Sequence, residues 1–182
     1  MNKNVPNILT VFRVILVPFF VLFYLTPAVS GAFGKYLPLA IFIAASITDF
    51  LDGAIARHYG FLTNFGRFMD PLADKILVGA ALICFVQTGR MAAWAVIVLI
   101  SREFVISGFR MLAAVSGRVI SAGIWGKLKT AVQMVTIILI LLDLPFAWFG
   151  ILCQVMVYLC VALSLISLAV YFKGNLDVLQ EK

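Results

Sequence analysis

Six long apolar stretches run through almost the whole of this chain. They lie at about residues 8–26, 37–57, 70–88, 91–114, 127–143 and 146–172. Most approach the roughly 20 residues that a helix needs to span a bilayer, whereas a barrel strand needs only about half as many. With 64% hydrophobic residues and a mean hydropathy of +1.11, a chain of 182 residues has too much apolar surface for a soluble core. The sequence therefore predicts an all-α polytopic membrane protein with six transmembrane helices.

The connections between these stretches are short, which predicts one membrane domain over residues 1–182 and no soluble module. Lys and Arg are concentrated on one side of the predicted membrane, and the connections on the other side hold only Lys35 and Arg90. Because cytoplasmic loops carry the excess of Lys and Arg, both termini are expected in the cytoplasm.

The N-terminal stretch allows a second interpretation. Lys3, an apolar run and Ala28-Val29-Ser30 are also typical of a secretory signal with its cleavage site. Arg13 lies well inside the run, and removal of this stretch would leave an odd number of spans. We therefore expect a retained first helix.

The net charge of +6 indicates an anionic partner. The basic residues follow the predicted topology rather than forming a stripe or an arm, so the lipid bilayer is favoured over nucleic acid. The three cysteines, Cys84, Cys153 and Cys160, lie within apolar stretches without metal-ligand spacing. They are expected to be packing residues.

Acidic residues are rare here and are concentrated in one place. Four of the eight, Asp49, Asp52, Asp70 and Asp74, lie in one short run. A carboxylate at the centre of a bilayer costs about 2.5–3.5 kcal/mol, so four would cost on the order of 10 kcal/mol, comparable to the whole stability of a domain. The run needs a cation or a water-filled cavity beside it, and it is the first candidate for a functional site.

On helices, this spacing pairs the carboxylates. Asp49 and Asp52 are three residues apart at the end of the second stretch and share a helix face. Asn64-Phe65-Gly66 predicts a turn, and Asp70-Pro71 predicts a helix start with Asp70 as the N-cap. Asp74 then follows one turn later, and two carboxylate pairs can face each other across a short cytoplasmic loop.

Two facing carboxylate pairs suit a pair of Mg²⁺ or Mn²⁺ ions, because hard cations prefer carboxylate oxygens. Such a two-metal site holds a phosphoanhydride and stabilises the charge on a transferring phosphoryl group. Arg57 and Arg67 would donate to phosphate oxygens, and Asp74 is the candidate catalytic base. The structural alternative is that Asp70 only caps a helix while Asp49 and Asp52 face loop water.

The run resembles the signature of the CDP-alcohol phosphatidyltransferase family, D-x2-D-G-x2-A-R-x8-G-x3-D-x3-D. Its eight fixed positions are matched by Asp49, Asp52, Gly53, Ala56, Arg57, Gly66, Asp70 and Asp74. The resemblance implies a metal-dependent transfer of a phosphatidyl group from a CDP-linked lipid to an alcohol, with release of CMP. It assigns metal binding to the four aspartates, shares Asp74 between metal and proton, and implies a homodimer. The residues it implies around the cytidine diphosphate are Asp52, Gly53, Ala56, Arg57, Gly66 and Asp70.

A second group of basic residues bears on the acceptor alcohol: Arg102, Arg110, Lys127 and Lys129. They predict a cationic pocket for an acceptor that carries its own phosphate, with simple positive-inside anchoring as the alternative. At 1.5 Å per residue, Arg102 lies about 16 Å into the fourth stretch and Asp49 about 18 Å into the second, so the two are expected in one cavity. Since a buried arginine in lipid normally has a partner, this stretch needs an ion pair, and a Glu103–Arg110 pair is predicted.

Three segments, residues 6–13, 101–104 and 126–130, resemble the bacterial, and in particular the enterobacterial, branch of this family. That resemblance implies CDP-diacylglycerol as donor, sn-glycerol 3-phosphate as acceptor and the bacterial inner membrane as location. Two alternatives stay open: another acceptor, such as serine, inositol phosphate or a phosphatidyl lipid, and, outside the family, a divalent-cation carrier.

The first turn of the chain has two interpretations. Asn7 and Thr10 are polar in an apolar context, and Arg13 lies three residues after Thr10. Either the arginine snorkels to the membrane surface, or this turn closes over the cytidine end of the donor through Asn7 and Thr10.

Overall fold

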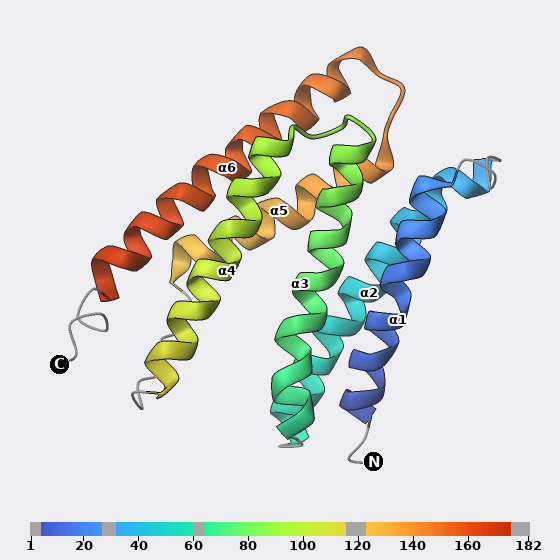
Figure 1. The fold of residues 1–182 in the computed structure, drawn as a ribbon. Coiled ribbons are helices and arrows are strands. Elements are labelled where there is room, and N and C mark those ends of the chain that lie inside the picture. Colours follow the sequence, from blue (N-terminus) through green and yellow to red (C-terminus); the bar gives the residue numbers. More distant parts are fainter. Residues whose placement is uncertain (1–4, 27–31, 60–63, 116–122, 176–182) are drawn as a thin grey trace. The chain divides into compact units, whose positions relative to one another are not determined.

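The computed structural model describes residues 5–26, 32–59, 64–115 and 123–175. Within these ranges, the side chains of residues 5–9, 32–33, 49–59, 64–71, 74 and 115 lie outside the description. The described residues form six α-helices and no strand (Figure 1). They are α1 (Val5–Leu25), α2 (Ala32–Tyr59), α3 (Asn64–Gln87), α4 (Ala93–Val115), α5 (Ile124–Leu142) and α6 (Ala147–Asn175).

The all-α prediction is confirmed, and each predicted apolar stretch corresponds to one of these helices. Among the described residues, α5 and α6 are long and apolar enough to cross a membrane. Helix α6 has 29 residues, which is longer than the roughly 20 that a bilayer core requires.

The predicted start of the third helix at Asp70 is wrong. Helix α3 begins at Asn64, so Asn64-Phe65-Gly66 is its first turn rather than a connection, and Asp70 and Pro71 lie inside it. A proline inside a helix removes one hydrogen bond and costs about 3 kcal/mol, but it is tolerated in apolar membrane-type helices. Helices α1 and α2 also continue through prolines, Pro18 and Pro38.

The chain divides into two compact units, Met1–Thr88 and Gly89–Lys182. In the first unit, α1 packs against both α2 and α3. Its core is aromatic. The ring centroids of Phe20 and Phe42 lie 6.1 Å apart, and the rings of Tyr24 and Phe85 meet edge to face with their centroids 5.6 Å apart. Phe20, Phe42 and Phe85 have no exposed surface. This packing holds the helices that carry the acidic run.

In the second unit, α6 packs against both α4 and α5, as Figure 1 also shows. Near the C-terminal end of α6, the Phe109 ring meets Tyr171 edge-on at 5.6 Å and Phe172 at 5.5 Å. The connections at the other end of the unit are joined by an ion pair, in which Arg90 Nη1 lies 2.5 Å from Asp143 Oδ1. A pocket of about 590 Å³ opens beside this pair.

Candidate functional site

The two halves of the acidic run lie on two consecutive helices of the first unit. Asp49 and Asp52 belong to α2, and Asp70 and Asp74 belong to α3. The two helices contact one another, and only residues 60–63 separate them in the chain. On the backbone, the members of each pair are one helical turn apart, so each pair shares a face.

The side chains of this run, with Gly53, Ala56, Arg57 and Gly66 between them, lie outside the described residues. Among the described residues, no group of three His, Cys, Asp or Glu side chains is placed to hold a metal ion. The predicted metal site, the cytidine diphosphate contacts and the role of Asp74 as base therefore stay predictions.

Arg13 on α1 does not snorkel. It is 1% exposed, and Thr10, three residues earlier on the same helix face, has no exposed surface. The snorkelling interpretation is wrong because the polar face of α1 packs inside the three-helix unit rather than reaching its surface. The side chain of Asn7 lies outside the described residues, so the predicted contact of this turn with the donor stays a prediction.

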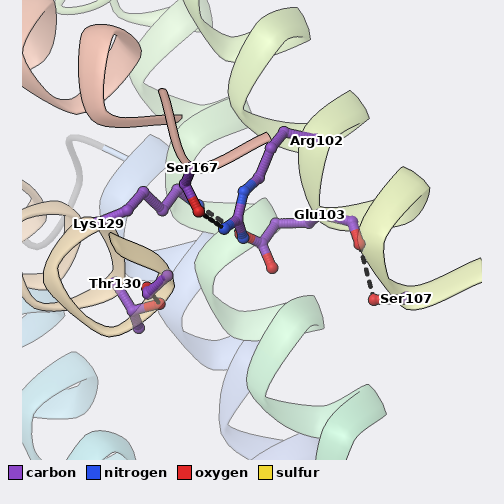
Figure 2. A network of polar contacts seen from close by, with 7 residues as sticks. Arg102, Glu103, Ser107, Lys129, Thr130 and Ser167 are labelled. Atoms are coloured by element: carbon purple, nitrogen blue, oxygen red, sulfur yellow. Dashed lines mark hydrogen bonds and ion pairs between the residues drawn. The ribbon is translucent and has the colours of Figure 1, made fainter. Parts of the chain in front are cut away.

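The best-defined polar cluster lies in the second unit and joins all three of its helices (Figure 2). The Glu103 carboxylate on α4 forms an ion pair with Lys129 Nζ on α5. Arg102 Nη1 donates to the same Glu103 oxygen, Oε1, at 2.9 Å. Arg102 Nη2 donates to Ser167 Oγ on α6. We call Arg102, Glu103, Lys129 and Ser167 the α4–α6 cluster.

The two cations of the cluster are buried, with Arg102 6% and Lys129 1% exposed. The side chain of Glu103 is 30% exposed, so it is the least buried of the three charged side chains. Two buried cations face one carboxylate, which leaves a net positive charge in surroundings of low polarity. Such a group favours a further anion, and an arginine fork beside a lysine suits a phosphate.

Local sequence explains how the three helices meet here. Gly126 lies one turn before Lys129, and a Cβ at this position would be 3.6 Å from Arg102 Nη2 and 3.8 Å from Ser167 Oγ. A small residue therefore lets the guanidinium and the hydroxyl lie close to the backbone of α5. Beside the cluster, Ser107 Oγ donates to the Glu103 carbonyl at 2.7 Å within α4.

The predicted Glu103–Arg110 pair is wrong. Glu103 pairs with Arg102 and Lys129, while Arg110 is exposed. The reason is geometric: Arg110 lies seven residues further along α4, about 10 Å in rise, whereas Lys129 approaches from the neighbouring helix. Of the four predicted acceptor residues, the structure brings Arg102 and Lys129 together and leaves Arg110 and Lys127 exposed. Asp49 belongs to the first unit and Arg102 to the second, so the cavity expected to hold both stays a prediction.

Sequence reasoning missed Ser167 and the polar face of α5. Gln133 and Thr136 follow Lys129 at one-turn spacing, and both are buried. Thr136 Oγ1 lies 3.2 Å from Cys160 Sγ on α6. The signal was present: polar residues at helical spacing within an apolar stretch indicate a buried helix–helix interface.

The fold and the charged cluster together are typical of a helical membrane protein that binds an anion. The described chain is an all-helical protein with two helices suited to a bilayer and a buried cationic cluster. Its sequence matches the family described as CDP-alcohol phosphatidyltransferase over residues 3–166. The chain belongs to that family, as the acidic run predicted.

Relatives of known name match most of this chain. A Bacillus subtilis protein is 39% identical, with 97% of each chain covered, and an Escherichia coli protein is 41% identical, with 75% of this chain and 76% of the relative covered. Both are named CDP-diacylglycerol–glycerol-3-phosphate 3-phosphatidyltransferase. A Mycobacterium tuberculosis protein, 42% identical with 78% of this chain and 67% of the relative covered, is named probable phosphatidylglycerophosphate synthase.

Proposed function

We propose that this chain transfers a phosphatidyl group from CDP-diacylglycerol to sn-glycerol 3-phosphate and releases CMP. The product is phosphatidylglycerol phosphate, a precursor of anionic membrane lipids. The observation that carries the proposal is the cationic α4–α6 cluster in a member of this family. A buried Arg102–Lys129 pair suits an acceptor that bears a phosphate, unlike an uncharged alcohol.

The donor end of the reaction is assigned to the acidic run on α2 and α3. Four carboxylates on two contacting helices provide the oxygen donors that Mg²⁺ and Mn²⁺ prefer. Asp49, Asp52, Asp70 and Asp74 would hold the ions, which supply charge neutralisation at the diphosphate. Arg57 would donate to phosphate oxygens beside Gly53, Ala56 and Gly66.

The chain's own residues then have separate tasks. Arg102 and Lys129, with Arg110 and Lys127 towards the surface, orient the acceptor through its phosphate. Asp74 accepts the proton of the attacking primary hydroxyl. A direct in-line displacement at the lipid-bearing phosphorus needs no covalent enzyme intermediate.

The membrane arrangement is also a proposal. Six spans, a single domain, cytoplasmic termini and a cytoplasm-facing site in the bacterial inner membrane are supported by the Lys and Arg distribution and by the apolar α5 and α6. The acyl chains of the donor stay in the bilayer during transfer. We propose that the protein is a homodimer, as its family resemblance implies.

The decisive experiment is to incubate purified protein in detergent with CDP-diacylglycerol, Mg²⁺ and candidate acceptors, and to measure CMP. Glycerol 3-phosphate should support CMP release, and omission of the divalent ion should abolish it. Release with serine, inositol phosphate or a phosphatidyl lipid instead would move the chain to another branch of the family. Metal flux into protein-containing vesicles without transfer would support a cation carrier.

A further inference from the structure

The cluster already contains an anion, and it is part of the chain. Both the Lys129 ammonium and the Arg102 guanidinium are directed at one oxygen of Glu103, Oε1 (Figure 2). The side chain of Glu103 is 30% exposed, whereas the two cations are buried. Glu103 is therefore the member of this charged group with the most room to move.

The cations keep further capacity. Arg102 Nε is buried and has no hydrogen-bond partner among the described residues. The guanidinium has five N–H donors, and the described contacts use Nη1 and Nη2. A tetrahedral oxyanion presents more acceptor oxygens than one carboxylate oxygen provides.

We propose that Glu103 is an internal counter-ion that occupies the phosphate-binding place of the α4–α6 cluster and moves aside when a phosphate monoester binds. Without a ligand, the carboxylate stabilises the buried Lys129 and Arg102. These two cations would otherwise be unpaired in surroundings of low polarity. A dianionic phosphate replaces this interaction, and the carboxylate turns away from the two cations.

An internal counter-ion of this kind makes the cluster selective for doubly charged anions over singly charged ones. A competing carboxylate raises the free-energy cost of every anion that enters, so a weak monoanion is rejected more readily than a doubly charged phosphate. Glu103 is thus a positioning and selectivity residue rather than a catalytic one. The inference rests on the proposed function only for the identity of the phosphate monoester as sn-glycerol 3-phosphate.

The test measures inorganic phosphate binding by titration calorimetry, using the full-length protein in neutral detergent with EDTA and without CDP-diacylglycerol. Removal of the competing charge in Glu103→Gln should tighten phosphate binding by at least about tenfold, because the incoming anion no longer displaces a carboxylate and no longer meets a like charge beside the cations. Lys129→Gln should abolish binding. Lys173→Gln removes an exposed charge elsewhere in the same unit and should bind like the native protein.

Unchanged or weaker phosphate binding in folded Glu103→Gln would overturn the inference. A carboxylate with only a structural role holds the two cations in position, so its loss would leave them less well placed to bind phosphate. If that variant fails to fold, Glu103→Asp decides: its shorter side chain keeps the charge but withdraws from the cations. We expect about threefold tighter phosphate binding in this variant, and no tightening overturns the inference.

Transfer assays separate this inference from the proposed function. The KM for glycerol 3-phosphate should fall in Glu103→Gln in parallel with the phosphate dissociation constant. Tighter phosphate binding with an unchanged KM would support the counter-ion and remove the acceptor from this cluster. Absence of any transfer to glycerol 3-phosphate would overturn the proposed function, and the phosphate titration would still decide the role of Glu103.

Discussion

Lys129 on α5 forms an ion pair with Glu103 on α4, which precedes it by 26 residues in the chain. The pair lies beside Arg102, whose guanidinium donates to the same carboxylate oxygen and to Ser167. An ion pair therefore joins α4 to α5, and a hydrogen bond joins α4 to α6. Breaking a buried pair by removing one partner is strongly destabilising, so this arrangement constrains which variants remain folded.

Removal of the proposed base should stop the reaction without removing the donor. In Asp74→Asn, the amide no longer accepts the proton of the attacking hydroxyl, and turnover should fall below detection while CDP-diacylglycerol still binds. CMP release and donor binding are measured on the same preparation. A normal rate of CMP release in this variant would refute the assignment of Asp74.

Arg110 is exposed on α4, so its side chain can be replaced without disturbing the packing of the helices. If it helps to hold the acceptor phosphate, Arg110→Ala should raise the KM for glycerol 3-phosphate several-fold more than the KM for the donor. Lys173→Ala, also exposed, is the matched control and should leave both values unchanged. Equal effects of Arg110→Ala on both substrates would argue for general electrostatics instead.

Ser167 contributes a single hydrogen bond to the cluster. Its removal in Ser167→Ala leaves one guanidinium donor unsatisfied and should lower the free energy of unfolding by about 1 kcal/mol, the scale of such bonds between membrane helices. Thermal unfolding in detergent measures the change. Ser101→Ala is the control because Ser101 is exposed on the same helix as Arg102. Equal shifts for the two serines would contradict the assigned bond.

Asp143 ends α5 in the left-handed conformation, with φ 43° and ψ 59°. Asn tolerates this conformation, so Asp143→Asn keeps the backbone geometry, weakens the exposed interaction with Arg90 and should cost less than about 1 kcal/mol. Asp143→Ala removes the short polar side chain that lets Asp and Asn adopt this region through local hydrogen bonds, and should cost about 1–2 kcal/mol more. Both are compared by thermal unfolding, with Arg90→Gln removing the ion pair without changing Asp143. Identical losses in the Asn and Ala variants would exclude a backbone contribution.

Cys153 offers a direct test of the proposed topology. It lines the pocket beside Arg90, whereas Cys84 and Cys160 are buried. A membrane-impermeant maleimide added to intact spheroplasts should label Cys153 and spare the other two thiols, and Cys153→Ser should abolish the signal. Labelling that requires lysis of the cells would place this end of the unit in the cytoplasm and reverse the proposed orientation.

The sequence alone determined the helical class and the family. Long apolar stretches admit few folds besides helices, because every backbone polar group must be satisfied within the segment. The spacing of the aspartates from Asp49 to Asp74 identified the family, because the gaps between them are a property of the sequence and do not depend on how the helices pack. The sequence did not determine where each helix begins. Proline is frequent at the first position of a helix, yet α3 begins at Asn64 and continues through Pro71.

Only the tertiary structure decided which charges meet. Arg102, Glu103 and Arg110 lie close together in sequence, and periodicity along one helix favoured the wrong partner for Glu103. The correct partner, Lys129, and the hydroxyl of Ser167 come from two other helices. Contacts between helices depend on how their faces pack, and a pattern read along one helix does not contain that information. The burial of Arg13 was decided in the same way, by the packing of α1 against α2 and α3.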